Sequence, residues 1–480
     1  MIRGRLAAST LGDLLGDWRR GGSGLHAYEA LAERIRLLLI DGRISADVRL
    51  PSERELSERL NLSRTTITAA YRQLRDTGYA RAVQGSGTTT TLPLVTPTSG
   101  MARGEVIDLT MASLPATDLL PEAARRATEE LTAYYVSPGY QLVGLPVLRE
   151  AIAARYTARG LPTEADQILV TNGAQGAIAL LARTLVARGD RVFAESPSYP
   201  HAYDALASAG GRIVTSPVTP ESGWDVPALT TTIARTTPVV AYTMPDFHNP
   251  TGRCMSEDDR HELLHAAAKV DTLLIADETT AELDIDRAEH HGPLAALAGE
   301  HGARVVQIGS ASKLLWGGLR IGWIRASAEI IGRLIAHRPA HDLGTAIWEQ
   351  LVVAELLGRT PEIVEERRGQ LGERRTALAT ALATHLPDWQ MPAHLRGGLA
   401  AWLQLPSPVS SQLTLAARAH GLHVTAGPRF GIDGAYERRL RLPLTAAPET
   451  LARAVEILGE LWPTVANAAP VHFSTSEPLV

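Results

Sequence analysis

The second part of the chain alternates short, mainly apolar segments with helical ones. The apolar segments have the length of β-strands and are Ile168–Thr171, Arg191–Glu195, Val239–Met244, Thr272–Ala276 and Val305–Ile308. Apolar strands separated by helices predict a parallel sheet covered by helices on both faces. Ligands bind such sheets at the carboxyl ends of the strands. We therefore expect an α/β domain with its site at that edge.

The length and composition of the chain limit what it can be. At 480 residues it is long enough for two or three hydrophobic cores. Its 45% hydrophobic and 21% charged residues are typical of a globular protein. No apolar run reaches the roughly 18 to 20 residues that span a bilayer, and the only cysteine, Cys254, cannot form an internal disulfide. We expect a cytoplasmic protein without a membrane partner, and no metal site.

Lysine is almost absent, which makes the two lysines of the chain, Lys269 and Lys313, informative. A GC-rich genome produces an Arg- and Ala-rich composition without a functional reason, so function has to explain only the lysines that remain. Lys269 lies in an Ala-rich, helix-like segment and is expected to be a surface charge. Lys313 follows an apolar strand and small residues, where an amine can act as a nucleophile.

Residues 26–92 have the pattern of a small helical domain. Behind a Gly-rich leader, residues 1–25, apolar residues at helical spacing predict a first helix over Ala27–Ile40. Ser52 and Glu55 have the spacing of a capping box, in which each side chain accepts a hydrogen bond from the other's amide. This capping box predicts a short second helix.

A third helix and a hairpin complete the pattern. Ser63 can cap a helix that runs to about Asp76, and Gly78 supplies a left-handed stop. Two strands and the Gly-rich turn between them follow as Tyr79–Val83, Gln84–Gly87 and Thr88–Leu92. The spacing of the second and third helices is that of a helix-turn-helix, and the hairpin would be its wing.

Charge and composition divide the chain further. Residues 1–91 hold 14 arginines and 10 acidic residues, a net +4, which leaves −9 for the rest. A modest basic excess suits nucleic acid but also a plain solvated surface. Residues 93–105 are rich in Pro, Ser and Gly and predict a linker. The second domain would span 106–465, with a smaller C-terminal subdomain over about 335–465, followed by a tail at 466–480.

Three motifs of the first domain are Leu50-Pro51-Ser52-Glu53-Arg54-Glu55-Leu56, Leu62-Ser63-Arg64-Thr65-Thr66-Ile67 and Gly85-Ser86-Gly87-Thr88. They resemble the winged helix-turn-helix of GntR-family transcription regulators. The resemblance implies that double-stranded DNA is a partner and that the residues facing it are Arg54, Ser63, Arg64, Thr65, Thr66 and Gly85. Family members often have Arg where this chain has Thr68. The plain alternative is that these side chains only cap a helix and carry surface charge.

The second domain has four motifs in order: Tyr140-Gln141-Leu142-Val143-Gly144-Leu145; Thr171-Asn172-Gly173-Ala174-Gln175; Glu195-Ser196-Pro197-Ser198-Tyr199-Pro200, followed by His248-Asn249-Pro250-Thr251-Gly252; and Ser310-Ala311-Ser312-Lys313, followed by Gly318-Leu319-Arg320-Ile321-Gly322. Together they resemble the class I/II aminotransferases, which belong to the fold-type I group of pyridoxal phosphate enzymes. The resemblance implies pyridoxal 5′-phosphate as cofactor, held as an aldimine by Lys313, on a mostly parallel sheet with a smaller α+β subdomain.

The implied cofactor-binding residues are Ala174, Gln175, Tyr199, Asn249, Asp277, Ser310, Ser312, Lys313 and Arg320. Their chemistry suits the roles that the resemblance assigns. Amides at a helix N-terminus, serines and an arginine bind phosphate. Tyr199 would stack on the pyridine ring, and Asn249 would donate to the phenolic oxygen. Asp277 would pair with the pyridinium nitrogen and keep the ring an electron sink.

Two parts of the sequence bear on how an effector is bound and on whether transamination occurs. Arg441 is implied as the arginine that clamps a carboxylate, although Arg439 is close enough in sequence to compete. The family usually has a tyrosine two or three positions after the aspartate, where this chain has Thr279 and Thr280. This departure puts transamination in question more than cofactor binding.

A GntR-type winged helix followed by an aminotransferase-like domain is the architecture of MocR/GabR-type regulators. That resemblance implies a homodimeric transcription regulator that senses an amino compound or pyridoxal phosphate itself, without physiological turnover. The rival interpretation is an active aminotransferase with a vestigial DNA-binding extension. A third interpretation is a winged helix attached to an inert scaffold.

Overall fold

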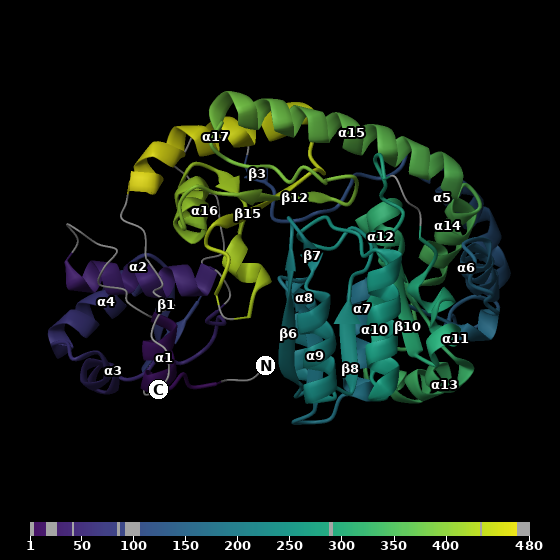
Figure 1. Ribbon diagram of the computed structural model, residues 1–480, viewed down its shortest axis with the longest axis horizontal. Coiled ribbons are helices and arrows are strands. Elements are labelled where there is room, and N and C mark those ends of the chain that lie inside the picture. The colour runs from purple at the N-terminus through teal and green to yellow at the C-terminus, as the bar shows by residue number, and fades with distance from the viewer. Residues whose placement is uncertain are drawn as a thin grey trace.

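The computed structural model describes residues 4–15, 26–40, 43–83, 87–91, 106–287, 291–432 and 434–467. The chain has an N-terminal helical domain, a large domain built on one sheet, and a smaller C-terminal subdomain. Figure 1 shows the C-terminal subdomain between the other two, with its helices arching over the top. No helix within these ranges has the length and apolar character needed to cross a membrane.

The N-terminal domain consists of α1 (Ala8–Leu15), α2 (Ala27–Ile40), α3 (Glu53–Leu60), α4 (Arg64–Asp76), β1 (Ala80–Val83) and β2 (Gly87–Thr90). The predicted capping box is present, because the Ser52 hydroxyl accepts from the Glu55 amide and the Glu55 carboxylate accepts from the Ser52 amide at 2.9 Å. Gly78 has φ 78° after α4. The two strands pair antiparallel. The predicted winged helix-turn-helix is therefore confirmed.

The leader contains a helix that the sequence analysis did not predict. Leu11 and Leu15, one turn apart on α1, are fully buried against the core formed by the other helices. Two apolar side chains at this spacing are enough to hold α1 in place, because the core that they join is formed mainly by the other helices of the domain. The wing turn with Gly85, the end of the predicted second strand at Leu92, and the predicted linker lie outside the described residues.

The large domain is built on an eight-stranded sheet in the order β4-β11-β10-β9-β8-β5-β6-β7. Its strands are β4 (Ile168–Asn172), β5 (Arg191–Ser196), β6 (Arg212–Thr219), β7 (Gly223–Trp224), β8 (Val240–Thr243), β9 (Leu273–Asp277), β10 (Arg304–Ser310) and β11 (Ile321–Arg325). Only β11 and β7 run antiparallel to their neighbours. The predicted mostly parallel sheet is confirmed. β6 and β11 were not predicted, because β6 is half exposed and β11 contains a glycine and directly follows a glycine-rich turn.

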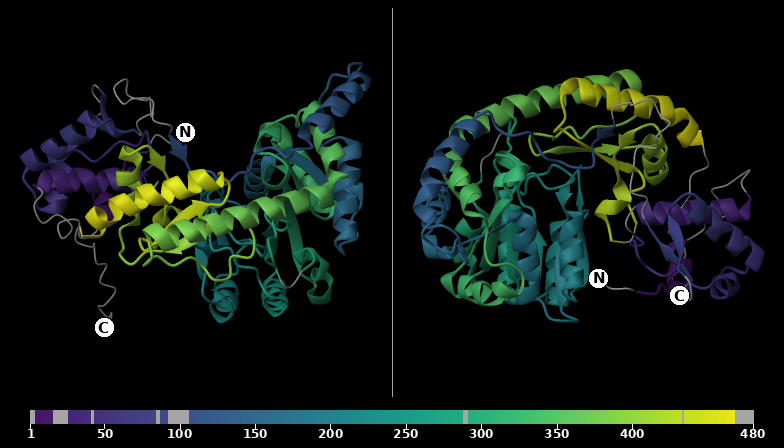
Figure 2. Two further views of the ribbon diagram at one scale, coloured as in Figure 1. Left: turned by 90° about the horizontal axis from the view of Figure 1, so that it is seen from above. Right: turned by 180° about the vertical axis from the view of Figure 1, so that it is seen from behind.

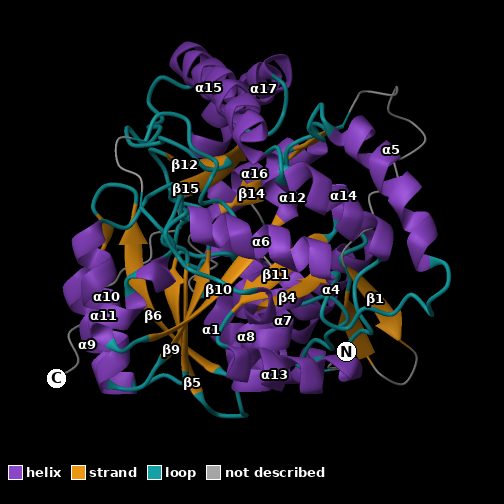
Figure 3. Cartoon of the chain, turned by 90° about the vertical axis from the view of Figure 1, so that its right-hand side faces the viewer, coloured by secondary structure: helices purple, strands orange, loops and turns teal. Residues whose placement is uncertain are grey.

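Helices cover both faces of this sheet, and alternate strand residues supply the two cores. In β8, Val240 and Tyr242 pack on one side and Ala241 on the other. The first side is covered by α7 (Gly173–Leu185), α8 (Pro200–Ser208) and α13 (Ala328–His337). The second side is covered by α9 (Val226–Thr236), α10 (Glu257–Lys269) and α11 (Ala298–His301). Figure 3 shows these layers around the strands.

The C-terminal subdomain combines a small sheet with long helices. Its strands are β12 (Ala400–Gln404), β14 (Thr425–Ala426) and β15 (Arg439–Pro443), and the pair β13 (Leu422–His423) and β3 (Ile107–Asp108) lies beside them. Its main helices are α15 (Thr360–His385), α16 (Ser410–Ala419) and α17 (Pro448–Asn467). The remaining main helices are α5 (Leu120–Leu131), α6 (Pro146–Ala158), α12 (Ala311–Leu314) and α14 (Ile347–Leu357). The two views in Figure 2 show the N-terminal domain beside this subdomain, where α2 packs on α16.

Candidate functional site

A cavity of about 700 Å³ opens at the carboxyl ends of the central strands. The segments that end β9 and β10, the N-terminus of α7, the loop after β8 and strand β15 all contribute to its lining. Every cofactor residue and the effector arginine named from the sequence line it: Ala174, Gln175, Tyr199, Asn249, Asp277, Ser310, Ser312, Lys313, Arg320 and Arg441. The tertiary structure thus brings together residues spread over about 270 positions of the chain.

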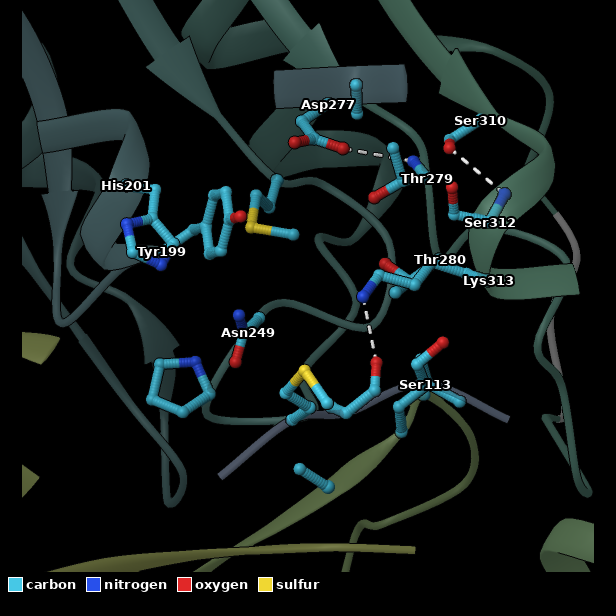
Figure 4. A pocket seen from close by; sticks show the side chains of 18 of the residues that line it. Ser113, Tyr199, His201, Asn249, Asp277, Thr279, Thr280, Ser310, Ser312 and Lys313 are labelled. Carbon is cyan, nitrogen blue, oxygen red and sulfur yellow. Dashed lines mark hydrogen bonds between the residues drawn. The ribbon is translucent and has the colours of Figure 1, made fainter. Parts of the chain in front are cut away.

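Lys313 lies on α12, directly after β10, and its amine points into the cavity (Figure 4). The Nζ atom donates a hydrogen bond of 2.8 Å to the carbonyl of Ala112. Burial lowers the pKa of Lys313 to about 8, and the positive charge of Arg441 acts in the same direction. Lys269, by contrast, is exposed at the end of α10. A lowered pKa leaves more of the amine unprotonated, and the unprotonated amine is the form that acts as a nucleophile.

Asp277 ends β9 and is 2% exposed. One carboxylate oxygen accepts from the Tyr242 hydroxyl at 2.6 Å, and the other accepts from the Thr279 amide at 3.0 Å. Burial raises the pKa of Asp277, and these hydrogen bonds oppose the rise. Thr280, one of the two residues in the usual tyrosine region, donates to the Asp246 carbonyl at 2.9 Å. Its hydroxyl is therefore already engaged.

The N-terminus of α7 and the loop before β11 form a cradle for an anion. A Cβ at position 322 would lie 2.4 Å from the backbone of Gly173. Because Gly322 has none, β11 can lie close to the start of α7. Arg320 has the left-handed φ of 54°, which is uncommon for a side-chain-bearing residue. The Ser312 hydroxyl is buried without a hydrogen-bond partner among the described residues. The cradle can bind a phosphate.

Tyr199 and Asn249 come from two different loops of the same pocket (Figure 4). Burial, together with the negative charge of Asp277, raises the pKa of Tyr199 to about 12, so its hydroxyl stays protonated at neutral pH. Asn249 follows β8 and is partly buried. A flat ring can lie against Tyr199, and the amide of Asn249 can donate to an oxygen on that ring.

Arg441 and Arg439 lie on the same strand but have different surroundings. Arg441 is 6% exposed, lies over the Phe430 ring at 4.9 Å and donates to the Thr110 carbonyl. Burial lowers its pKa to about 10, so it remains charged at neutral pH. Arg439 does not line the cavity and pairs with Glu221 at 2.8 Å. Of these two arginines, Arg441 can meet a carboxylate in the cavity.

Several residues in or directly behind the pocket were missed in the sequence. Tyr242 lies within an apolar strand, so nothing in the pattern marks its hydroxyl as functional. Ala112 belongs to a segment without periodicity just after the predicted linker. His201 and Arg429 also line the cavity, and both contact Asp204, at 3.2 and 2.9 Å. His201 directly follows the Tyr199-Pro200 motif, which was the only available signal.

The proposed DNA-facing residues gather at the start of α4 and on α3. Ser63, Arg64 and Thr65 are exposed, and the Ser63 hydroxyl accepts from the Thr66 amide as the helix cap. Arg54 is exposed and pairs with Glu58 at 3.0 Å. An exposed arginine beside free helix amides is suited to phosphate or base contacts.

Thr68, which departs from the family pattern, has a different role in the fold. Its hydroxyl donates to the Glu53 carboxylate at 2.7 Å, which ties α4 to α3.

Comparison with known proteins agrees with this description. Residues 105–458 match the family described as aminotransferase class I and II, and residues 27–89 match the bacterial regulatory proteins of the gntR family. The chain is 28% identical to the uncharacterized HTH-type transcriptional regulator YdfD of Bacillus subtilis, over 91% of this chain and 96% of the relative. It is 29% identical to the probable rhizopine catabolism regulatory protein MocR of Rhizobium meliloti, over 75% and 78%.

Among solved structures, LysN of Thermus thermophilus, an alpha-aminoadipate aminotransferase complexed with N-(5′-phosphopyridoxyl)-L-leucine, superposes with a TM-score of 0.68 at 29% identity. The match covers 75% of this chain and 92% of LysN. The prediction of a DNA-binding regulator fused to an aminotransferase-like domain is confirmed. The chain belongs to the class I and II aminotransferase family and carries a GntR-type DNA-binding domain in front of it, which is the domain combination of MocR-type transcription regulators.

Proposed function

We propose that this protein regulates transcription by binding pyridoxal 5′-phosphate in the cavity and reporting the arrival of a small ligand to its DNA-binding domain. The ligand is an amino compound or pyridoxal phosphate itself. Lys313 is the amine that holds the cofactor, and Arg441 takes the carboxylate of an amino-compound effector. DNA contacts come from the start of α4, from Arg54 and from the wing.

The cavity offers groups that this cofactor would satisfy. Asp277 is buried, and its carboxylate accepts hydrogen bonds from two neutral donors, the Tyr242 hydroxyl and the Thr279 amide. A buried carboxylate stays charged only beside a cationic partner, and a protonated pyridine nitrogen is one. The Ser312 hydroxyl lacks a hydrogen-bond acceptor among the described residues, and a phosphate oxygen would supply it. The cavity volume also leaves room for a small amino compound beside the cofactor.

Each of the cavity residues named above has a binding or orienting role in this proposal. When bound, pyridoxal phosphate supplies an aldehyde that captures amines and a ring that accepts electrons. The lowered pKa of Lys313 keeps a share of its amine unprotonated near neutral pH. Tyr199 packs on the ring, Asn249 donates to its phenolic oxygen, and Asp277 holds a proton on its nitrogen. The phosphate is bound by Ala174, Gln175, Ser310, Ser312 and Arg320.

One segment carries the regulatory part of the proposal, because it reaches both the cavity and the DNA-binding domain. We call residues 427–432 and 434–441 the bridging segment. Its two ends line the cavity, with Arg429 and Phe430 at one end and Arg441 at the other. The Phe430 carbonyl also accepts from the Ser198 amide at 3.0 Å, in the loop that carries the stacking tyrosine. A ligand in the cavity therefore contacts the bridging segment directly.

The middle of the bridging segment contacts the N-terminal domain. The Arg43 guanidinium approaches Gly434 so closely that a Cβ there would lie 2.3 Å from its central carbon. Glu437 accepts from the Ser411 amide at 3.0 Å and from the Ser411 hydroxyl at 2.9 Å, at the start of α16. Burial raises the pKa of Glu437, whereas these hydrogen bonds and the charges of Arg34 and Arg43 lower it. Glu437 is thus hydrogen-bonded to the start of α16 and lies within the electrostatic influence of Arg34 on α2 and of Arg43.

Through these contacts, ligand binding in the cavity can affect the placement of the DNA-binding domain. An effector carboxylate at Arg441 would neutralise a buried positive charge at one end of the bridging segment. A ligand shifts an equilibrium only by its different affinity for the two arrangements. The arrangements in question are two placements of the DNA-binding domain against α16, and the charge pair of Glu437 with Arg34 and Arg43 would differ between them.

We also propose that the regulator is a homodimer. Support comes from three large side chains in the segment between α5 and α6: Tyr135, Val136 and Tyr140 are 70%, 95% and 69% exposed. Exposed apolar groups this close together favour a protein interface.

Footprinting of the protein's own promoter region tests both domains in one experiment. We expect a protected sequence whose protection changes when pyridoxal phosphate or one of a panel of amino acids is added. The variant Glu437→Gln should keep its cofactor and its DNA binding but lose most of the ligand effect, because it removes the charge facing α2. Glu362→Gln, which removes a surface charge on α15, is the matched control. Protection of no specific sequence under any condition would contradict the proposal.

The alternative function is an aminotransferase with a vestigial N-terminal extension. It is favoured by the convergence of the predicted cofactor residues on one cavity and by the likeness to LysN. Purified protein mixed with amino donors and keto acids separates the two functions. Sustained multiple turnover without sequence-specific DNA retention would establish the enzyme. A single half-reaction at most, with specific DNA retention, is expected for the regulator.

A further inference from the structure

Helices α10 and α11 lie side by side on the outer layer of the large domain (Figure 3) and bring histidines together. His261 and His265 are one turn apart on α10, so they share a face. Glu300 and His301 end α11. None of these residues lines the cavity described above.

The ligating atoms of three of these side chains converge. His261 Nδ1 lies 2.8 Å from His301 Nε2, and one atom each of His261, Glu300 and His301 lie within 4.8 Å of one another. The His265 ring is close behind, with its centroid 6.1 Å from that of His301. His261 and His301 are partly buried, whereas Glu300 is exposed. The cluster is therefore open to an ion from solvent.

The surrounding charge favours a cation. Glu257 and Asp258 in the first turn of α10 precede His261 by four and three residues, which places them on the same side of the helix. Together with Glu300 they add three carboxylates to the part of the surface where the imidazoles lie. Two neutral imidazoles can share only one hydrogen bond between them, whereas a metal ion accepts a lone pair from each.

We propose that His261, His301 and Glu300 bind one divalent transition-metal ion of the zinc, nickel or copper class, with His265 as an additional ligand. Imidazole and carboxylate together suit these ions, whereas Mg²⁺ and Ca²⁺ prefer oxygen ligands alone. Nitrogen ligands about 2.0 Å from a tetrahedral zinc lie roughly 3.3 Å apart. The two imidazoles therefore need to separate by about half an ångström, which small side-chain rotations at a surface achieve. The ion would clamp α11 to α10.

Metal binding by the full-length, untagged protein tests this site. After treatment with a chelator, equilibrium dialysis against Zn²⁺ or Ni²⁺ is expected to give about one bound ion per chain, and Zn²⁺ should raise the thermal unfolding midpoint. His301→Ala should weaken binding by more than roughly tenfold, since even changes behind the ligands cost about 10- to 100-fold. His261→Gln should do the same while keeping a side chain of similar reach.

His420→Ala serves as the control, because His420 is exposed directly after α16 and its ring bonds the Ala416 carbonyl of that helix. It should bind metal like the unaltered protein. Mg²⁺ should neither bind nor raise the midpoint. Failure to retain one ion per chain, or equal retention by His301→Ala, His261→Gln and the unaltered protein, would overturn the proposal. Circular dichroism of each variant verifies that it is folded.

Discussion

Tyr242 donates a hydrogen bond of 2.6 Å to Asp277 inside the large domain, where Tyr242 is fully buried and Asp277 is 2% exposed. The bond stabilises the charged form of a carboxylate whose pKa burial raises. Asp277 is the residue proposed to hold the proton on the pyridine nitrogen. Tyr242 is thus a positioning residue, because it acts on the cofactor through Asp277.

The variant Tyr242→Phe should therefore bind pyridoxal phosphate more weakly. Loss of a hydrogen bond to a charged group costs about 1.5 kcal/mol or more, which is roughly a tenfold rise in the dissociation constant. Fluorescence titration with the cofactor measures the change, and the absorption spectrum of the bound cofactor should shift with it. Tyr156→Phe, which removes another buried hydroxyl and its 3.2 Å bond from Trp323, should leave both unchanged. Equal affinity in Tyr242→Phe would refute the role of Tyr242.

Lys313→Ala should abolish the yellow colour of the protein incubated with pyridoxal phosphate, because the only other lysine of the chain lies outside the cavity. Lys269→Ala is the matched control and should colour normally, since Lys269 is exposed on α10. Borohydride reduction followed by peptide mapping identifies the modified residue. A label on Lys269 would overturn the assignment, and a colourless unaltered protein would favour an inert scaffold.

The rate of cofactor uptake by the cofactor-free protein should rise with pH, with a midpoint near 8. The reason is that the pKa of Lys313 is lowered to about 8, first by burial and then by the charge of Arg441. The amine is protonated and unreactive below that pH and becomes neutral above it. Stopped-flow absorbance over a pH series gives the midpoint. Arg441→Gln removes a positive charge, so its midpoint should move upward; a midpoint near the ordinary lysine value of about 10.4 in the unaltered protein would contradict the prediction.

Arg441→Gln should also lose the response to amino-compound effectors, whereas Arg439→Gln should keep it. Arg441 lines the cavity and Arg439 pairs with Glu221 outside it. Removing a charged hydrogen-bond partner of a carboxylate weakens binding by roughly 10- to 100-fold. Calorimetric titration of the cofactor-loaded protein with candidate amino acids measures this. If both variants respond alike, the carboxylate is held elsewhere.

Arg64→Ala should weaken operator binding by roughly 10- to 100-fold and relax the sequence preference, because Arg64 is exposed at the start of α4 and suits a base edge. Arg54→Ala should weaken binding to all sequences more evenly and reduce its dependence on salt, as expected of a phosphate contact. Fluorescence anisotropy with the footprinted sequence and a scrambled one, at two salt concentrations, distinguishes the two. If both variants lose the same affinity for the footprinted and the scrambled sequence, Arg64 does not read a base.

The local motifs could be read from the sequence because each rests on neighbouring residues. The capping box of Ser52 and Glu55, the left-handed Gly78 and the small-residue turn before Lys313 depend on backbone conformations that a few residues encode. The five apolar strands could also be predicted locally. Each is buried on both faces of the sheet, so its apolar character shows in a few consecutive residues.

Tertiary structure decided the features that depend on contacts between distant segments. It put Tyr242 against Asp277 and brought the bridging segment from the cavity to Arg43, just after α2. It also gave Arg441 and Arg439 different surroundings, the cavity for Arg441 and Glu221 for Arg439. It also brought His261 and His301 together, 40 residues apart, where the sequence predicted no metal site. Periodicity and motif spacing describe one element at a time, whereas these relationships arise only when separate elements pack and fix which side chains face each other.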